Sequence, residues 1–205
     1  MIERRYMTLA DGLAIEERAA GAPVLRGRAI VYGSRSYDLG GFTEIIEPGA
    51  FDHLFTREAA PDVVALWNHD ASALLGRTAS GTLRLMPDAA GVGFELDPPD
   101  TTLGRDLLAL CRRGDVTGCS FAFTVERGGD RLEHDDAGTT RYITRASGLF
   151  DVSLVTNPAY GATNVSVRSL ASMIAEHVAP ASIPLSERDR FNLARAGVWA
   201  RRART

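Results

Sequence analysis

The chain has 205 residues, of which 45% are hydrophobic and 24% are charged, and its formal net charge is −3. These values are typical of a globular protein with one sizeable domain or two small ones. So small a net charge argues against binding of nucleic acid or membranes across the whole surface. No apolar run reaches the roughly 18 residues of a membrane span, and the N-terminus lacks the apolar segment of a signal peptide.

Two further features of the composition narrow the chemistry. The two cysteines, Cys111 and Cys119, make neither a disulfide framework nor a CxxC metal site, so we expect a reduced, cytoplasmic setting. No metal or other cofactor is indicated. All 23 basic residues are arginine, and the absence of lysine excludes a Ser–Lys catalytic dyad.

The first part of the chain predicts short strands. Residues 1–19 are polar and are expected to pair as a first strand with a turn at 10–12, and residues 25–32 predict a second strand. After a loop rich in Ser, Asp and Gly, residues 42–47 predict another short strand. Residues 50–57 are expected to form one or two helical turns.

The middle of the chain contains the clearest strand and the clearest helix. Residues 62–68, DVVALWN, include a continuous apolar run that predicts a buried strand. Residues 80–86 and 91–97 predict a hairpin. Residues 102–113 predict a helix with a leucine face, a glycine after its end, and Thr102 as its N-terminal cap.

The following stretch predicts further strands at 120–126, 140–145 and 148–156, with a Gly- and Asp-rich loop around 128–139 and one more strand at 162–168. This makes eight to ten short strands with turn signals every 8–15 residues and one internal helix. The pattern predicts a mainly β protein with flanking helices, folded as a closed or nearly closed β-barrel.

The composition changes near residue 168, which predicts a β-barrel domain over 1–168 and a helical, arginine-rich C-terminal tail over 169–205. Residues 169–178 have apolar side chains at helical spacing, and a linker with two prolines follows. Residues 186–205 hold six Arg against one Glu and one Asp. The tail is either a solvated amphipathic helix or a segment that docks on a partner or is removed by processing.

Two residues could form a nucleophile and its base. Ser120 lies in the strand-like stretch GCSFAF, and a serine hydroxyl attacks a carbonyl only when a nearby base accepts its proton. His69 comes straight after the strand 62–68, a rigid position that suits a general base. The alternatives are a small residue tolerated in a barrel wall and a histidine packed at a barrel rim.

A third candidate is Asp151, a lone acid within the apolar stretch GLFDVSLV. A buried carboxylate needs a partner, and a histidine that becomes charged would be one; the alternative is an acid at a sheet edge. His134, in the acidic loop EHDD, could suggest a metal ion, but consecutive loop residues rarely converge on one ion. Serine, histidine and acid on three strands are weak signals singly and stronger together.

Several motifs, in the same order, resemble the tailed-phage prohead (capsid maturation) serine protease family over most of residues 25–167. They are GRAIVYGSRSYDLGGFTEIIEPGAF (27–51), LWNHD (66–70), LGR (75–77), GCSFAFTV (118–125) and LFDVSLVTNPAYGAT (149–163). That family resembles the herpesvirus assemblin proteases, so the resemblance implies a closed β-barrel ringed by helices.

The resemblance also implies a serine endopeptidase with Ser120 as nucleophile and His69 as base. Asp151 matches the third member, which is often Glu in the family and a second His in assemblins, and aspartate has a reach one methylene shorter than glutamate. The oxyanion hole is expected to consist of backbone N–H groups, with the turn at 157–160 as one possible source.

The partners implied are a scaffold protein or the scaffolding segment of the major capsid protein, inside an immature capsid (prohead) in the host cytoplasm. The resemblance also implies self-cleavage and a homodimer. Neither a membrane nor a specific nucleic acid is expected as a binding partner. The motifs are compatible with a phage and with a phage-derived gene transfer particle alike. The alternatives are an inactive protease-fold scaffold that binds capsid subunits, and a barrel-shaped binding module; an inactive relative would usually lack Ser120 or His69.

Overall fold

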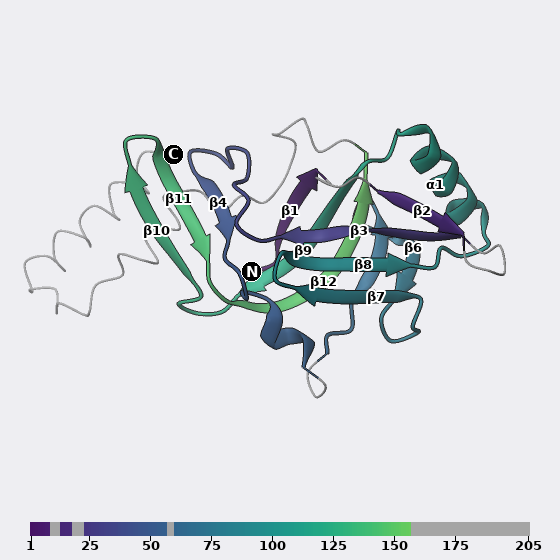
Figure 1. Cartoon of the computed structure of the whole chain (residues 1–205), viewed down its shortest axis with the longest axis horizontal. Helices are drawn as coiled ribbons and strands as arrows, with labels where there is room; N and C mark the ends of the chain where they lie inside the picture. The colour runs from purple at the N-terminus through teal and green to yellow at the C-terminus, as the bar shows by residue number, and fades with distance from the viewer. Residues whose placement is uncertain (9–12, 18–22, 57–59, 157–205) are drawn as a thin grey trace, which may run out of the picture. The chain divides into compact units, whose positions relative to one another are not determined.

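The computed structural model describes residues 1–8, 13–17, 23–56 and 60–156 (Figure 1). Over these residues the chain is mainly β, with one α-helix and one short 3₁₀ helix, so the predicted fold class is confirmed at this level. The predicted strand at 162–168 and the predicted tail at 169–205 lie outside the described residues. Within the described ranges, no helix is both long and apolar enough to cross a membrane.

The described strands hydrogen-bond into three sheets, with the orders β1-β9-β12-β5-β6, β2-β3-β8-β7 and β10-β11-β4. Neighbouring strands are antiparallel, except that β12 runs parallel to β5 and β11 parallel to β4. The strands are β1 (Glu3–Thr8), β2 (Ala14–Glu17), β3 (Pro23–Val31), β4 (Thr43–Ile46), β5 (Val64–Trp67), β6 (Asp70–Arg77), β7 (Leu83–Asp88), β8 (Gly91–Leu96), β9 (Gly118–Val125), β10 (Asp130–Asp135), β11 (Gly138–Ile143) and β12 (Ala146–Val155).

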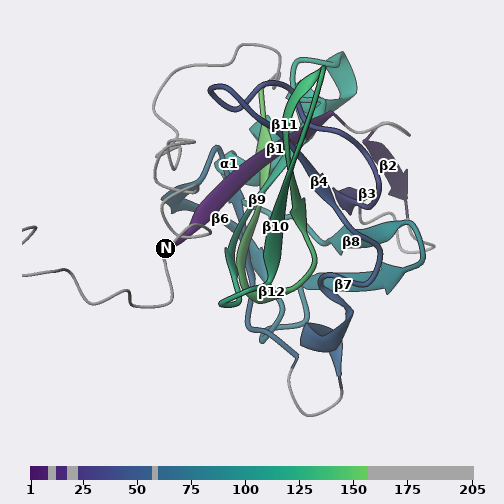
Figure 2. The same ribbon diagram turned by 90° about the vertical axis from the view of Figure 1, so that its left-hand side faces the viewer.

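The hydrophobic core joins the five-stranded and four-stranded sheets. Leu25 and Phe94 come from the four-stranded sheet, Phe121 and Leu154 from the five-stranded one, and all four are almost fully buried in one cluster. In Figure 1, β3, β8 and β7 pass in front of β9 and β12, and Figure 2 shows the three-stranded sheet from its own side. Each such side chain contributes about 1.5–3 kcal/mol on burial, so this core fixes the strand that carries Ser120.

Most of the predicted elements are found close to their predicted bounds. The strands predicted at 25–32, 42–47 and 62–68 and the hairpin of β7 and β8 are present, as is the 3₁₀ helix η1 (Asp52–Phe55). The helix α1 (Thr102–Arg113) is also present, but its cap is Thr101 and not Thr102. Thr101 keeps an extended backbone and its side chain accepts a hydrogen bond from Gly104 N, whereas Thr102 is already helical.

Two predictions about strands were wrong, and one strand was not predicted. Residues 1–19 do not pair as one strand, because β1 joins β9 and β2 joins β3 in different sheets. The predicted loop at 128–139 instead contains β10 and the start of β11, because the charged side chains of β10 hid its strand character from the hydrophobic pattern; the rest of β11 lies within the strand predicted at 140–145. The strand β6 was not predicted, since most of its residues are exposed and lack apolar alternation.

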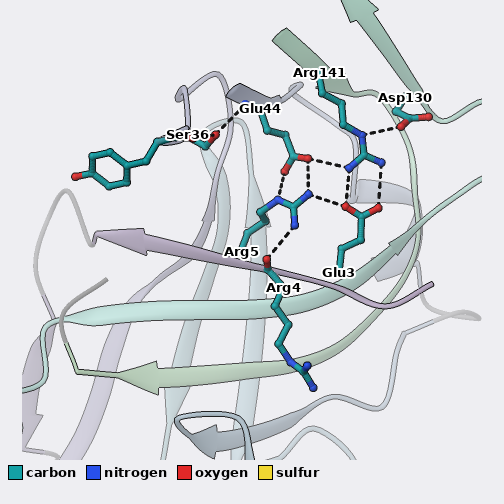
Figure 3. A network of polar contacts seen from close by, with 8 residues as sticks. Glu3, Arg4, Arg5, Ser36, Glu44, Asp130 and Arg141 are labelled. Carbon is teal, nitrogen blue, oxygen red and sulfur yellow. Dashed lines mark hydrogen bonds and ion pairs between the residues drawn. The ribbon is translucent and has the colours of Figure 1, made fainter. Parts of the chain in front are cut away.

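A network of buried charges fastens β1 to the three-stranded sheet (Figure 3). Arg141, whose side chain has no exposed surface, pairs with Glu3 at 2.5 Å, Asp130 at 2.7 Å and Glu44 at 3.0 Å. Arg5 bonds Glu44 at 2.5 Å and Glu3 at 2.6 Å. Burial alone would raise the pKa of Glu3, but its bonds and charge attraction with Arg141 and Arg5 lower it below its usual value.

Candidate active site

Ser120 is the third residue of β9, which has β1 on one side and β12 on the other. Side chains alternate along a strand, so Phe121 and Phe123 point into the core while Ser120 and Ala122 point to the other face of the sheet. The rings of Phe121 and Phe123 lie 5.3 Å apart and both contact the ring of Phe51. This aromatic cluster holds β9 rigidly behind the serine, which is itself fully buried.

His69 lies in the two-residue turn between β5 and β6, and not at the strand end itself. Asn68 and His69 both have positive φ, at 52° and 57°, a conformation that residues other than glycine seldom adopt and that matches a tight hairpin turn. Asn68 N donates to Leu154 O at 3.0 Å, and Thr156 N donates to the Asn68 side-chain oxygen at 3.3 Å. These two bonds attach the turn to the end of β12.

Asp151 reaches the face of Ser120 because of a β-bulge in β12. Leu149 is opposite Phe123 and Asp151 is opposite Ala122, so two residues of β12 correspond to one step of β9 and Phe150 is the extra residue. In a regular strand Leu149 and Asp151 would point to the same face. The bulge lets Leu149 enter the core while Asp151 faces the serine side of the sheet.

The three residues predicted from the sequence come together in one line of contacts. His69 Nε2 lies 2.5 Å from Ser120 Oγ, and His69 Nδ1 lies 2.6 Å from Asp151 Oδ1. The side chains of His69 and Asp151 are 8% and 9% exposed. An ionised carboxylate can only accept, so Nδ1 donates to Asp151 and Nε2 is left to accept the proton of Ser120. The aspartate is therefore long enough to reach the imidazole here.

One further side chain at the site, Ser153, was missed in the sequence. Its hydroxyl donates to Asp151 Oδ1 at 2.9 Å and lies 3.1 Å from His69 Nδ1. Ser153 is also directly opposite Ser120 in the strand register. The available signal was its spacing: a residue two positions after Asp151 on a strand points to the same face.

The cysteines and the other histidine candidate do not join this site. Cys119 precedes Ser120 but lies in the core, and burial raises the pKa of its thiol well above the usual value, which disfavours a thiolate nucleophile. Burial raises the pKa of Cys111 to about 11. His134 Nδ1 lies 2.9 Å from Thr139 Oγ1 in the β10–β11 hairpin.

No group of three His, Cys, Asp or Glu side chains in the described part of the chain is arranged to hold a metal ion. The turn at 157–160, expected as a source of oxyanion donors, lies outside the described residues. What the described residues do bring together is a serine, an imidazole and a carboxylate, an arrangement suited to acyl transfer.

Comparison with known protein families identifies the chain. The family model of the caudovirus prohead serine proteases matches residues 12–176. The chain belongs to this family. The matched range includes Ser120, His69 and Asp151, and β1 lies before it. The resemblance seen in the motifs is therefore confirmed.

A search of the curated proteins found no match to this prohead protease. Among solved structures, it is similar to the bacteriophage T4 capsid assembly protease gp21, with 11% sequence identity, a TM-score of 0.49, and coverage of 76% of this chain and 99% of that one.

Proposed function

We propose that this chain is a serine endopeptidase of capsid maturation in which Ser120 is the nucleophile, His69 the general base and acid, and Asp151 the residue that orients the imidazole. The observation that carries the proposal is the unbroken line of contacts from Ser120 Oγ through both nitrogens of His69 to Asp151 Oδ1. Membership of the prohead serine protease family supports the same reaction.

The reaction follows from this arrangement. Ser120 Oγ bonds to the carbonyl carbon of the scissile peptide while its proton moves to His69 Nε2. His69 then gives that proton to the leaving amine, the C–N bond breaks, and an ester of Ser120 remains. Water, deprotonated by His69, releases the new carboxylate and restores the serine. Asp151 balances the positive charge that forms on His69 in both halves of the reaction.

The proposed substrates are a scaffold protein or the scaffolding segment of the major capsid protein, cut inside a prohead in the host cell. Cleavage of the protease by itself is also proposed. Membership of the caudovirus prohead serine protease family supports these assignments. The particle belongs either to a phage or to a gene transfer agent.

The proposal extends to the fold and the assembly. A closed β-barrel would join the five-stranded and four-stranded sheets, which already pack on one core. The active species is proposed to be a homodimer that binds capsid subunits, without a membrane or a specific nucleic acid. Both the β-barrel and the dimer are proposed from the resemblance of the family to the assemblin proteases in fold.

The test is co-expression of the protease with the capsid protein precursor encoded beside it, followed by intact mass spectrometry of the precursor. The wild type is expected to remove a defined fragment from the precursor, and Ser120→Ala to leave it whole while folding normally, because only the nucleophilic oxygen is lost. Ser147→Ala is a matched control, since Ser147 lies on β12 and its hydroxyl bonds Thr124 away from the line of contacts.

Each outcome separates the candidate functions. Cleavage of the precursor by the Ser120→Ala variant would show that Ser120 is not the nucleophile. Unchanged precursor with both proteins, each folded and bound to capsid subunits, would favour the inactive assembly protein. The mass of the released fragment also gives the cleavage site.

A further inference from the structure

Ser153 does not belong to the proposed triad, but its side chain contacts two of the triad's members, Asp151 and His69. It lies on β12, opposite Ser120 and two residues after Asp151, and it is fully buried. Its hydroxyl is 2.9 Å from Asp151 Oδ1 and 3.1 Å from His69 Nδ1. The Ser153 hydroxyl therefore contacts both the carboxylate and the imidazole nitrogen whose alignment the reaction requires.

The hydrogen bonds have a defined direction. Asp151 Oδ1 is an acceptor, so the Ser153 hydroxyl donates its only proton to that oxygen. The lone pairs of Ser153 Oγ are then free to face the N–H of His69 Nδ1 as a second acceptor. Oδ1 thus accepts from both Ser153 and His69, and the three atoms form a closed triangle.

We propose that Ser153 is a positioning residue that fixes the Asp151 carboxylate and holds the proton of His69 on Nδ1. This inference rests on the proposed function for its catalytic meaning. An aspartate with a single partner can rotate about its side-chain bonds, whereas a second bond to the same oxygen keeps that oxygen in line with Nδ1. With the proton held on Nδ1, Nε2 stays unprotonated beside Ser120 Oγ, ready to accept its proton.

The test uses a fluorophosphonate probe, which needs no knowledge of the natural substrate. Ser120 Oγ bonds to phosphorus, fluoride leaves, and the serine proton passes to His69 and then to solvent. The labelling rate constant at saturating probe is expected to fall about tenfold or more in Ser153→Ala, while the probe concentration for half-saturation stays the same. Ser153→Thr keeps the hydroxyl and is expected to recover most of the rate.

Controls separate positioning from folding. Ser147→Ala removes an exposed hydroxyl from the same strand and is expected to label at the wild-type rate. Thermal unfolding identifies any variant that has lost its fold. A Ser153→Ala protein that folds and labels as fast as the wild type would overturn the inference and leave the triad assignment standing.

A second measurement decides the inference without activity. The Nδ1 proton of His69, bonded to Asp151, is expected to give a low-field proton NMR signal in the wild type, assigned by its loss in His69→Ala. In Ser153→Ala this signal is expected to broaden or shift, and in Ser147→Ala to stay. If the wild type is not labelled, the proposed function fails; an unchanged signal in Ser153→Ala would then overturn the inference as well.

Discussion

Two buried polar clusters lie on this fold, and they are built in opposite ways. The cluster at His69 runs from Ser120 through the two nitrogens of the imidazole to Asp151, with Ser153 beside Nδ1, and Asp151 is its carboxylate. The cluster at Arg141 is a mesh of five ionised side chains, in which Arg141 contacts three carboxylates and Arg5 contacts two of them.

The difference shows why one cluster suits chemistry and the other suits structure. A proton that moves from Ser120 to His69 creates a positive charge beside Asp151, so the charge formed is balanced at once. In the mesh each charged group already has a partner of opposite charge, and removing one of them leaves the remaining buried charges with fewer partners. We therefore expect substitutions in the line to reduce activity and those in the mesh to reduce stability.

The largest effect is expected from Asp151→Asn. The amide nearly preserves shape but no longer stabilises a charged imidazole, and it can hold the wrong tautomer of His69. We expect the cleavage rate to fall by about 10⁴-fold, measured as single-turnover processing of the capsid precursor by intact mass. The melting temperature should change little.

The matched control for Asp151→Asn is Asp130→Asn in the mesh. Asp130 is as buried as Asp151, with 9% of its side chain exposed, and it accepts a bond from Arg141. We expect this variant to lose stability and to keep its cleavage rate when folded. A near-normal rate in Asp151→Asn would remove Asp151 from the triad.

The next effect is on stability, in Arg141→Met. Methionine fills much of the same space but leaves Glu3, Glu44 and Asp130 buried without their shared partner, which costs about 3–5 kcal/mol. We expect the melting temperature to fall by about 10 °C, measured by calorimetry. The folded fraction should still react with the fluorophosphonate probe at the wild-type rate.

Arg145→Met provides the comparison for Arg141→Met. Arg145 pairs with Glu126 on the surface, with about half of each side chain exposed, and such pairs contribute at most about 1 kcal/mol. Equal melting temperatures for the two variants would contradict a structural role for the mesh.

The smallest effect is a pH dependence in Glu3→Gln. The lowered pKa of Glu3 means that its ionised form stabilises the folded state above the ordinary glutamate pKa, and this stabilisation is lost as the pH falls through the lowered value. At pH 7 we expect a loss of about 1–2 kcal/mol relative to wild type, measured by urea unfolding. The difference should close in acid, below the lowered pKa.

Glu126→Gln, in the surface pair with Arg145, is the control for Glu3→Gln and should show little change at either pH. A Glu3→Gln deficit of the same size at neutral and acid pH would mean that volume, and not charge, is what Glu3 supplies to the mesh.

The sequence predicted the parts of this protein that depend on local pattern. Alternating apolar residues located most strands, a leucine face and a glycine located α1, and a serine, a histidine and an acid in family motifs located the candidate site. Where a strand carries mainly charged side chains, as β10 does, the hydrophobic pattern was silent and the predicted loop was wrong.

What the tertiary structure decided was direction and distance. The bulge at Phe150 turns Asp151 to the side of Ser120, and the positive φ of His69 aims its ring at both. The contacts of Ser153 and the mesh around Arg141 join residues that are distant in the chain, such as Arg141 and Glu3. Sequence sets which groups are available, but their mutual distances depend on register and bulges, which arise only when strands pair.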